Sequence, residues 1–170
     1  NEIIKILPDK ENSIVNLYFN ENNILFELEN CIVVSRLLDG EFLKYEQIFT
    51  EDYNTKIKLN RVDLLSSLER ASLISKDNKK TPVKLEITNN DNLIITSNTE
   101  FGTSYEEVFI ELEGESLNIA FNPKYLIDAL KVIEDDEITI QFMTSLSPCI
   151  IKGIDNNEYK YLILPLKINE

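Results

Sequence analysis

The sequence contains no histidine, and this absence removes several classes of site at once. Histidine is the commonest general base and the commonest protein ligand of zinc. Only two cysteines are present, so the four cysteine or histidine ligands of a structural zinc site cannot be assembled. A Ser-His-Asp catalytic set is excluded for the same reason. We therefore expect no catalytic residues, no metal and no cofactor in this chain.

Glycine and long apolar runs are also scarce. The four glycines are not clustered, so the sequence has no glycine-rich loop that could cradle phosphates. No apolar run approaches the roughly 18 residues of a membrane span, and no signal peptide opens the chain. We expect a cytoplasmic protein with no membrane partner, in which Cys31 and Cys149 are buried free thiols. Because the sequence begins at Asn1 rather than Met, we expect a processed chain or a piece of a longer one.

What the sequence has in excess is negative charge. Thirty acidic residues against 17 Lys and Arg give a formal net charge of −13, which argues against a simple nucleic-acid binder. The basic residues are unevenly distributed, because the stretch 61–80 carries more Lys and Arg than Asp and Glu. The acidic runs "LDGE" (38–41) and "EDDE" (134–137) lack the spacing of a calcium loop, and we interpret both as solvated turns.

The order of apolar patterns repeats along the chain. Period-2 and β-branched runs predict strands, and apolar residues at helical spacing predict helices after Asn60 and Asn122, two side chains suited to capping a helix. Pro123 then occupies the first helical position, where it is favoured. A strand-helix-strand-strand-strand unit occurs twice: strand 55–59, helix 60–76 and strands 83–88, 92–98 and 105–112, then strand 116–121, helix 122–136 and strands 137–143, 148–154 and 158–166.

The first 50 residues contain only part of such a unit. Residues 1–6 form a possible helix end, and three strands follow at 14–19, 24–29 and 31–38. The alternation of apolar and polar residues in 14–19 predicts a half-buried strand. The predicted fold class is therefore α+β, with antiparallel sheets joined edge to edge and the helices on one face.

Four segments in order carry a family resemblance: "SRLLDGEF", "RASLISKDNKK", "FNPKYLIDALKVI" and "YLILPLKI". Together they resemble the bacterial sliding clamp, the beta subunit of DNA polymerase III, collinearly over essentially all 170 residues. The resemblance implies the DNA-clamp fold and a C-terminal fragment of such a protein. Residues 1–50 would be the second half of the middle clamp domain, and residues 51–170 the complete C-terminal clamp domain.

The resemblance also implies a function in DNA replication. Full-length family members form a head-to-tail homodimeric ring that encircles duplex DNA without sequence specificity. They act as processivity factors and have no active site, although the holoenzyme is a DNA-directed DNA polymerase, a nucleotidyltransferase. The polymerase III catalytic subunit, the clamp loader and repair polymerases bind them through short peptide motifs. A peptide-binding scaffold of the same fold without a DNA role is the alternative, and an enzyme with a carboxylate-bound metal is a third hypothesis.

Two sets of residues are carried over by position. Pro165 cannot donate a ladder hydrogen bond, so it marks a strand edge or end, and the apolar residues around it suit a peptide anchor. Leu43 departs from the family, which often has proline there. The implied peptide-binding pocket consists of Leu43, Gln47, Ile48, Asn122, Tyr125, Leu162, Leu164, Pro165, Leu166 and Lys167. The implied DNA-facing residues are Arg70, Lys76, Lys79, Lys80, Lys124 and Lys131.

Overall fold

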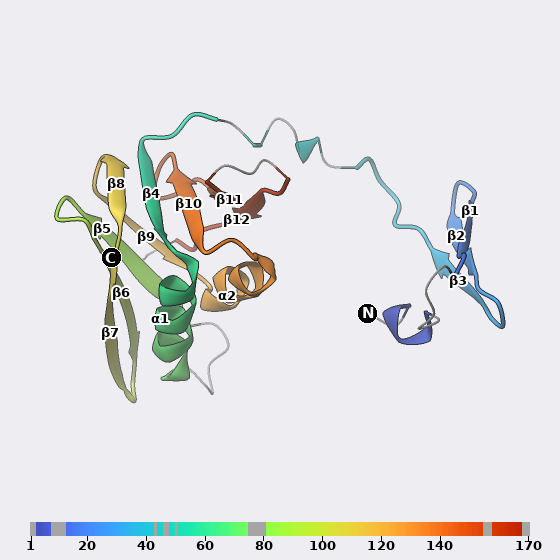
Figure 1. Ribbon diagram of the computed structural model, residues 1–170, viewed down its shortest axis with the longest axis horizontal. Helices are drawn as coiled ribbons and strands as arrows, with labels where there is room; N and C mark the ends of the chain where they lie inside the picture. The colour runs from blue at the N-terminus through green and yellow to red at the C-terminus, as the bar shows by residue number, and fades with distance from the viewer. Residues whose placement is uncertain are drawn as a thin grey trace. The chain divides into compact units, whose positions relative to one another are not determined.

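A computed structural model of the protein describes residues 3–7, 13–42, 44–45, 48–49, 51–74, 81–154 and 158–167. The chain separates into two compact units, Asn1–Tyr45 and Glu46–Glu170, and each is described by itself (Figure 1).

The first unit is a short helix followed by a three-stranded antiparallel sheet in the order β1-β2-β3. The turn between β1 and β2 forms because the side-chain oxygen of Asn20 accepts hydrogen bonds from the backbone N–H groups of Asn22 (3.0 Å) and Asn23 (2.8 Å). Its elements are η1 (Ile4–Ile6), β1 (Asn16–Phe19), β2 (Asn23–Glu27) and β3 (Ile32–Arg36).

Two expectations for this unit are wrong. Strand β1 is not half-buried, because all four of its residues are exposed, Phe19 to 71%. Apolar alternation buries a face only where a second layer covers it, and no described residue of this unit supplies that layer for β1. Cys31 is likewise exposed rather than buried, whereas Cys149 of the second unit is buried as expected; both are free thiols.

The second unit contains the repeated order that the sequence predicts. Helices α1 and α2 each follow a strand directly and precede a run of antiparallel strands (Figure 1). The elements are β4 (Thr55–Asn60), α1 (Arg61–Leu73), β5 (Val83–Thr88), β6 (Asn92–Thr99), β7 (Gly102–Phe109), β8 (Glu111–Gly114), β9 (Leu117–Phe121), α2 (Pro123–Val132), β10 (Glu137–Phe142), β11 (Cys149–Gly153) and β12 (Tyr161–Ile163).

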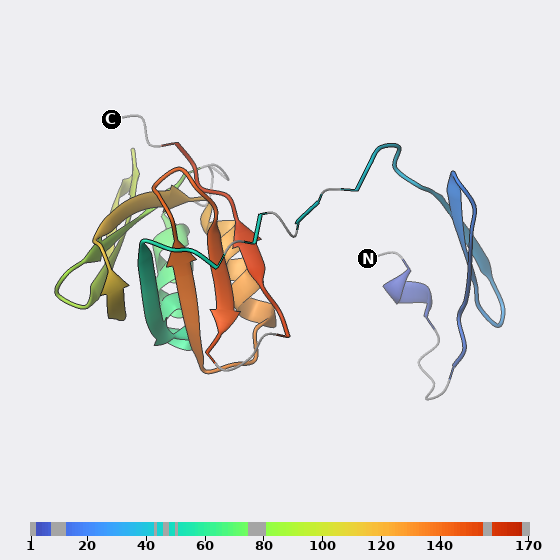
Figure 2. The ribbon, with the colours of Figure 1, turned by 90° about the horizontal axis from the view of Figure 1, so that it is seen from above.

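The two repeats are interlocked through their first strands. Strand β4 of the first repeat pairs with β10 in a five-stranded sheet of order β12-β11-β10-β4-β8. Strand β9 of the second repeat pairs with β5 in a four-stranded sheet of order β7-β6-β5-β9. Because each sheet contains a strand from the other repeat, α1 and α2 are brought side by side on the inner side of the strands (Figures 1 and 2).

Both helices begin where the sequence predicts. The Asn60 side chain accepts from the N–H groups of Val62 and Asp63, and Asn122 accepts from Lys124 N–H. Helix α2 ends at Val132, four residues before the predicted end, because Ile133 turns to an extended conformation that buries its side chain.

The predicted end of α1 lies outside the described residues. The described helix stops at Leu73, and the end predicted at residue 76 falls in the undescribed stretch that follows Ile74.

The predicted strand 105–112 is two strands in different sheets. Strand β7 ends at Phe109 in the four-stranded sheet, and β8 begins at Glu111 in the five-stranded sheet. Ile110 lies between them, fully buried, with its N–H donating to Asp91 O at 2.9 Å. The apolar alternation continues through this change of sheet, so periodicity alone does not reveal it.

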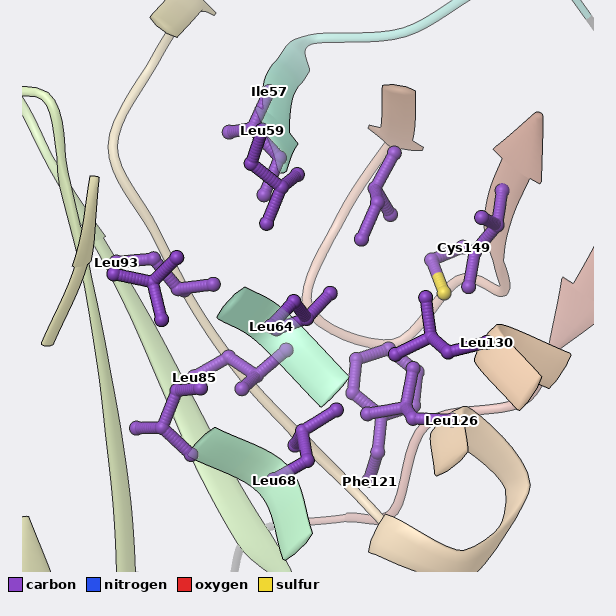
Figure 3. Packing of buried hydrophobic residues seen from close by; sticks show 14 of the residues in the cluster. Ile57, Leu59, Leu64, Leu68, Leu85, Leu93, Phe121, Leu126, Leu130 and Cys149 are labelled. Carbon is purple, nitrogen blue, oxygen red and sulfur yellow. The ribbon is translucent and has the colours of Figure 1, made fainter. Parts of the chain in front are cut away.

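The apolar core fills the space between the helix pair and the sheets (Figure 3). Leu64 and Leu68 of α1 and Leu126 and Leu130 of α2 point toward one another and toward the strands. Each is almost completely buried, so the core orders both helices relative to both sheets. Strand residues that complete the labelled cluster are Ile57, Leu59, Leu85, Leu93, Phe121 and Cys149.

Gly114 provides a test of how β8 joins β4. Its φ is +103°, and a Cβ there would lie 2.0 Å from the Asn54 carbonyl oxygen. Gly114→Ala should therefore lower the free energy of unfolding by about 2 kcal/mol or more beyond Gly102→Ala, since overpacking adds to backbone strain. Gly102 also has a positive φ (+150°), but nothing lies within 4 Å of its added Cβ. Equal unfolding midpoints for the two variants in urea would contradict the close β8–β4 approach.

Candidate functional site

A groove of about 530 Å³ lies between α2 and the C-terminal strand. Its lining is apolar or aromatic except for the carboxylate of Asp128. A concave, mainly apolar surface with a few polar groups is typical of a site for a small molecule or a peptide side chain. The lining residues are Tyr125, Asp128, Ala129, Tyr161, Leu162, Ile163 and Leu164.

Helix α2 forms one wall through residues at helical spacing. Tyr125, Asp128 and Ala129 stand three and four residues apart, so they share one face of the helix. The cap at Asn122 and the proline at position 123 fix where this helix starts, and therefore which residues face the groove.

The other wall is the sheet edge formed by β12. Ile163 pairs with Cys149 and Leu162 with Ile150 of β11, and no further strand of the described residues pairs with β12 on its other side. The chain then leaves the five-stranded sheet, and Leu166 N–H donates to Ala120 O of β9 at 2.7 Å. Pro165 lies in the chain between the end of β12 and the bridge at Leu166, where the backbone does not need to donate a ladder hydrogen bond.

Tyr159 contacts residues next to both walls of the groove. The Tyr159 hydroxyl donates to the carboxylate of Asp135, just beyond the end of α2, and its ring lies 5.6 Å from that of Tyr161. Burial first, and then the Asp135 carboxylate, raise the pKa of Tyr159 well above its ordinary value, so the phenol stays protonated at neutral pH. The Arg61 guanidinium donates to Asp135 O (2.8 Å) and Leu130 O (3.2 Å), which satisfies carbonyls at the end of α2.

The structure places some of the implied pocket residues in the groove and others outside it. Tyr125, Leu162 and Leu164 line the groove. Asn122 caps α2, Leu166 bridges to β9, and Pro165 and Lys167 follow the groove wall along the chain. Ile48 is partly exposed, and Leu43 and Gln47 lie outside the described residues.

Four groove residues were missed by the sequence analysis. Asp128 and Ala129 follow Tyr125 at helical spacing, and this signal could have identified them. Tyr161 and Ile163 alternate with Leu162 along β12, so a strict period-2 interpretation would place Tyr161 and Ile163 on one face of the strand and Leu162 on the other. In the structure, residues of both faces line the groove, because β12 is at the edge of its sheet.

The implied DNA-facing residues are partly engaged in ion pairs. Arg70 bonds to Glu106 of β7, and Lys131 bonds to Glu69 of α1. These carboxylates raise the pKa of both basic groups, which therefore remain charged at neutral pH. Lys124 is exposed near the start of α2. The other three, Lys76, Lys79 and Lys80, lie outside the described residues.

Among the residues that the structure describes, no group of three or more Cys, Asp or Glu side chains could hold a metal ion. No helix in these ranges is long and apolar enough to span a membrane.

Comparison with known proteins defines the class. Residues 46–167 match the family model described as DNA polymerase III beta subunit, C-terminal domain. A beta sliding clamp from Staphylococcus epidermidis is 35% identical over 167 residues, which are 98% of this chain and 44% of that protein. The chain therefore spans less than half the length of this curated relative.

Solved structures agree in fold. The crystal structure of the DNA polymerase sliding clamp from Bacillus subtilis matches with a TM-score of 0.85 and 35% identity, over 99% of this chain and 44% of that one. The DNA polymerase III subunit beta from Pseudomonas aeruginosa gives a TM-score of 0.85 at 26% identity, over 98% and 46%.

The fold is thus the DNA-clamp fold that the family resemblance implies, and the exchange of first strands between the repeats was not predicted. The chain belongs to the family of the DNA polymerase III beta subunit, the bacterial sliding clamps.

Thiol labelling tests the strand pairing beneath the groove. Burial raises the pKa of Cys149 to about 12, and its partner in the ladder is Ile163 of β12. At pH 8 in native buffer, a thiol reagent should therefore modify Cys31 rapidly and Cys149 only after denaturation, because the reactive species is the thiolate. Mass spectrometry of the labelled chain gives the readout, with Cys31→Ser as the control that should remain unlabelled. Equal native labelling of both thiols would show that β12 does not cover Cys149.

Proposed function

We propose that this chain is the DNA-associating and partner-binding part of a ring-shaped sliding clamp, a processivity factor that acts in the cytoplasm and has no active site of its own. Family membership supports the role in replication. In this proposal the full-length protein closes as a head-to-tail homodimer around duplex DNA. It tethers the polymerase, the clamp loader and repair polymerases, and it raises their local concentration at the DNA.

The proposal includes a domain assignment. Residues 1–50 would be the second half of the middle clamp domain, and residues 51–170 the complete third domain. Two observations support a boundary about five residues earlier than this: the two compact units divide between Tyr45 and Glu46, and the family model starts at residue 46. The exposed face of β1 supports the assignment as well, since the missing half of a domain would supply the covering layer.

The groove is the observation that carries the partner-binding role. It is open, apolar and bordered by a strand edge, which is the combination that receives a short peptide with an apolar anchor. We infer that such a peptide carries a Gln near its start and a Leu-Phe-like end. Leu164 is 66% exposed, so it is available to contact the anchor without unfolding any element. Lys167 is also exposed, and it can meet an acidic side chain or the peptide backbone.

The helix pair supports the DNA role. Helix α1 carries Arg61 and Arg70 against Asp63 and Glu69, so its charges cancel, and α2 carries one positive charge in excess. In a chain of net charge −13, the helices are thus the less acidic side and the one suited to face phosphates. A scaffold of the same fold without a DNA role would bind the peptide but not duplex DNA.

A peptide titration tests the groove. Leu164→Asp should weaken binding of a labelled peptide with a Gln near its start and a Leu-Phe end by at least about tenfold, because it removes one apolar contact and buries a carboxylate. Fluorescence anisotropy gives the affinity.

The matched control is Leu73→Asp. Leu73 lies in α1, is 54% exposed and is not among the residues that line the groove. This variant introduces the same charge and should leave peptide affinity unchanged. If both variants weaken binding equally, net charge rather than the groove decides the affinity. If the unmodified chain does not bind the peptide at all, the assignment of the groove in this chain is wrong.

A further inference from the structure

The described surface has a second large hollow, between the solvent-facing sides of α1 and α2. Its volume is about 580 Å³, and three charged side chains line it, whereas Asp128 is the one charged residue that lines the peptide groove. Both helices contribute a charged group to it, Glu69 and Arg70 from α1 and Lys131 from α2. The remaining lining residues are Ser66, Ser72, Leu73 and Ile127.

The two basic groups of this hollow are held in different ways. Arg70 donates twice to one oxygen of Glu106, from Nε (2.9 Å) and from Nη2 (2.6 Å), and Nη2 also reaches Ser67 Oγ (2.9 Å). The Glu106 side chain is only 21% exposed. This is a fork geometry that ties α1 to β7, so Arg70 is fixed and largely neutralised.

Lys131 is held by one exposed contact. Its Nζ lies 2.8 Å from Glu69 Oε1, and the two side chains are 55% and 47% exposed. An ion pair this exposed contributes little to stability, because water screens it and two flexible side chains must be ordered. The Arg70 side chain is similarly exposed (54%), but three hydrogen bonds hold it, so Lys131 can change partners at a smaller cost than Arg70.

We propose that the hollow is a site for one backbone phosphate of duplex DNA, and that Glu69 closes it in the free protein by pairing with Lys131. The proposal rests on the DNA-facing role proposed above for the helix pair, and it adds a regulation of that role. Binding exchanges the Glu69 carboxylate for a phosphate on Lys131, and the released carboxylate then repels that phosphate. The contact is consequently weak and brief, which suits a surface that must move along DNA.

The test removes the closing carboxylate. Glu69→Gln should bind a short labelled duplex DNA about tenfold more tightly than the unmodified chain at about 50 mM salt, with a salt dependence steeper by about 0.9, as expected for one added phosphate contact. Adding Lys131→Gln to this variant should abolish the gain. Anisotropy titrations at about 50 and 200 mM salt measure both quantities.

The matched control is Glu137→Gln on the outer face of the five-stranded sheet. Glu137 pairs with Lys58 at 3.2 Å and is 54% exposed, so the variant changes the same charge in a similar ion pair on another face. It should leave DNA affinity unchanged. Equal gains from Glu69→Gln and Glu137→Gln would show a net-charge effect and overturn the proposal.

Two further outcomes separate this inference from the function on which it rests. If the unmodified chain binds duplex DNA and Glu69→Gln binds no more tightly, the closing role of Glu69 is wrong while the DNA-facing role stands. If neither protein binds DNA at about 50 mM salt, the DNA-facing assignment of the helix pair fails, and the phosphate site fails with it. Thermal unfolding of each variant should match the unmodified chain, since both ion pairs are exposed.

Discussion

The arrangement of the second unit depends on the exchange of first strands between its two repeats. A β-α-β-β-β unit has an apolar sheet face that one short helix cannot cover. Because β4 pairs with β10 and β9 with β5, neither repeat can close its sheet without the other. The helices that follow β4 and β9 are then placed side by side over one continuous core, and Arg61 at the start of α1 fixes the end of α2.

The groove is a consequence of this exchange. Strand β9 lies in one sheet and β12 in the other, and the chain after β12 crosses back to Ala120. The crossing carries Leu164 away from the core and along the first turns of α2, which starts three residues after Ala120. An apolar segment near the end of an acidic chain is thus half core and half accessible surface, with Ile163 buried and Leu164 exposed.

Local chemistry explains what the sequence could predict. The Asn60 and Asn122 caps and the proline at position 123 act over three or four residues, so their signals are complete in the sequence. Strand β5 was predicted with its observed bounds because its alternation coincides with one buried face. The apolar patterns also predicted the order of the repeats, and the family resemblance added the DNA-clamp fold and an expected role for the C-terminal strand.

The sequence predictions are wrong where residues distant in the chain determine the end of an element or the burial of a side chain. Ile110 is buried and continues the apolar alternation of 105–112, so no residue in this stretch marks the change of sheet. Helix α2 ends early because Ile133 reaches the core and because Arg61, 69 residues from Leu130 in the sequence, donates to the Leu130 carbonyl of its last turn. The apolar side chains of β1 remain exposed because their covering layer is not among the described residues of that unit.

The two faces of the second unit differ in how their charges are compensated. On the outer side of the five-stranded sheet, Lys56 and Lys58 are flanked by glutamates, so that surface is a compensated ladder rather than a basic patch. The helix face is compensated more loosely, through one fixed pair and one exposed pair. In a chain of net charge −13, neither face therefore provides a strong electrostatic attraction for DNA. Retention on DNA, in the function proposed, must then come mainly from closure of the ring, while the phosphate contact proposed for the hollow between α1 and α2 adds a weak attraction.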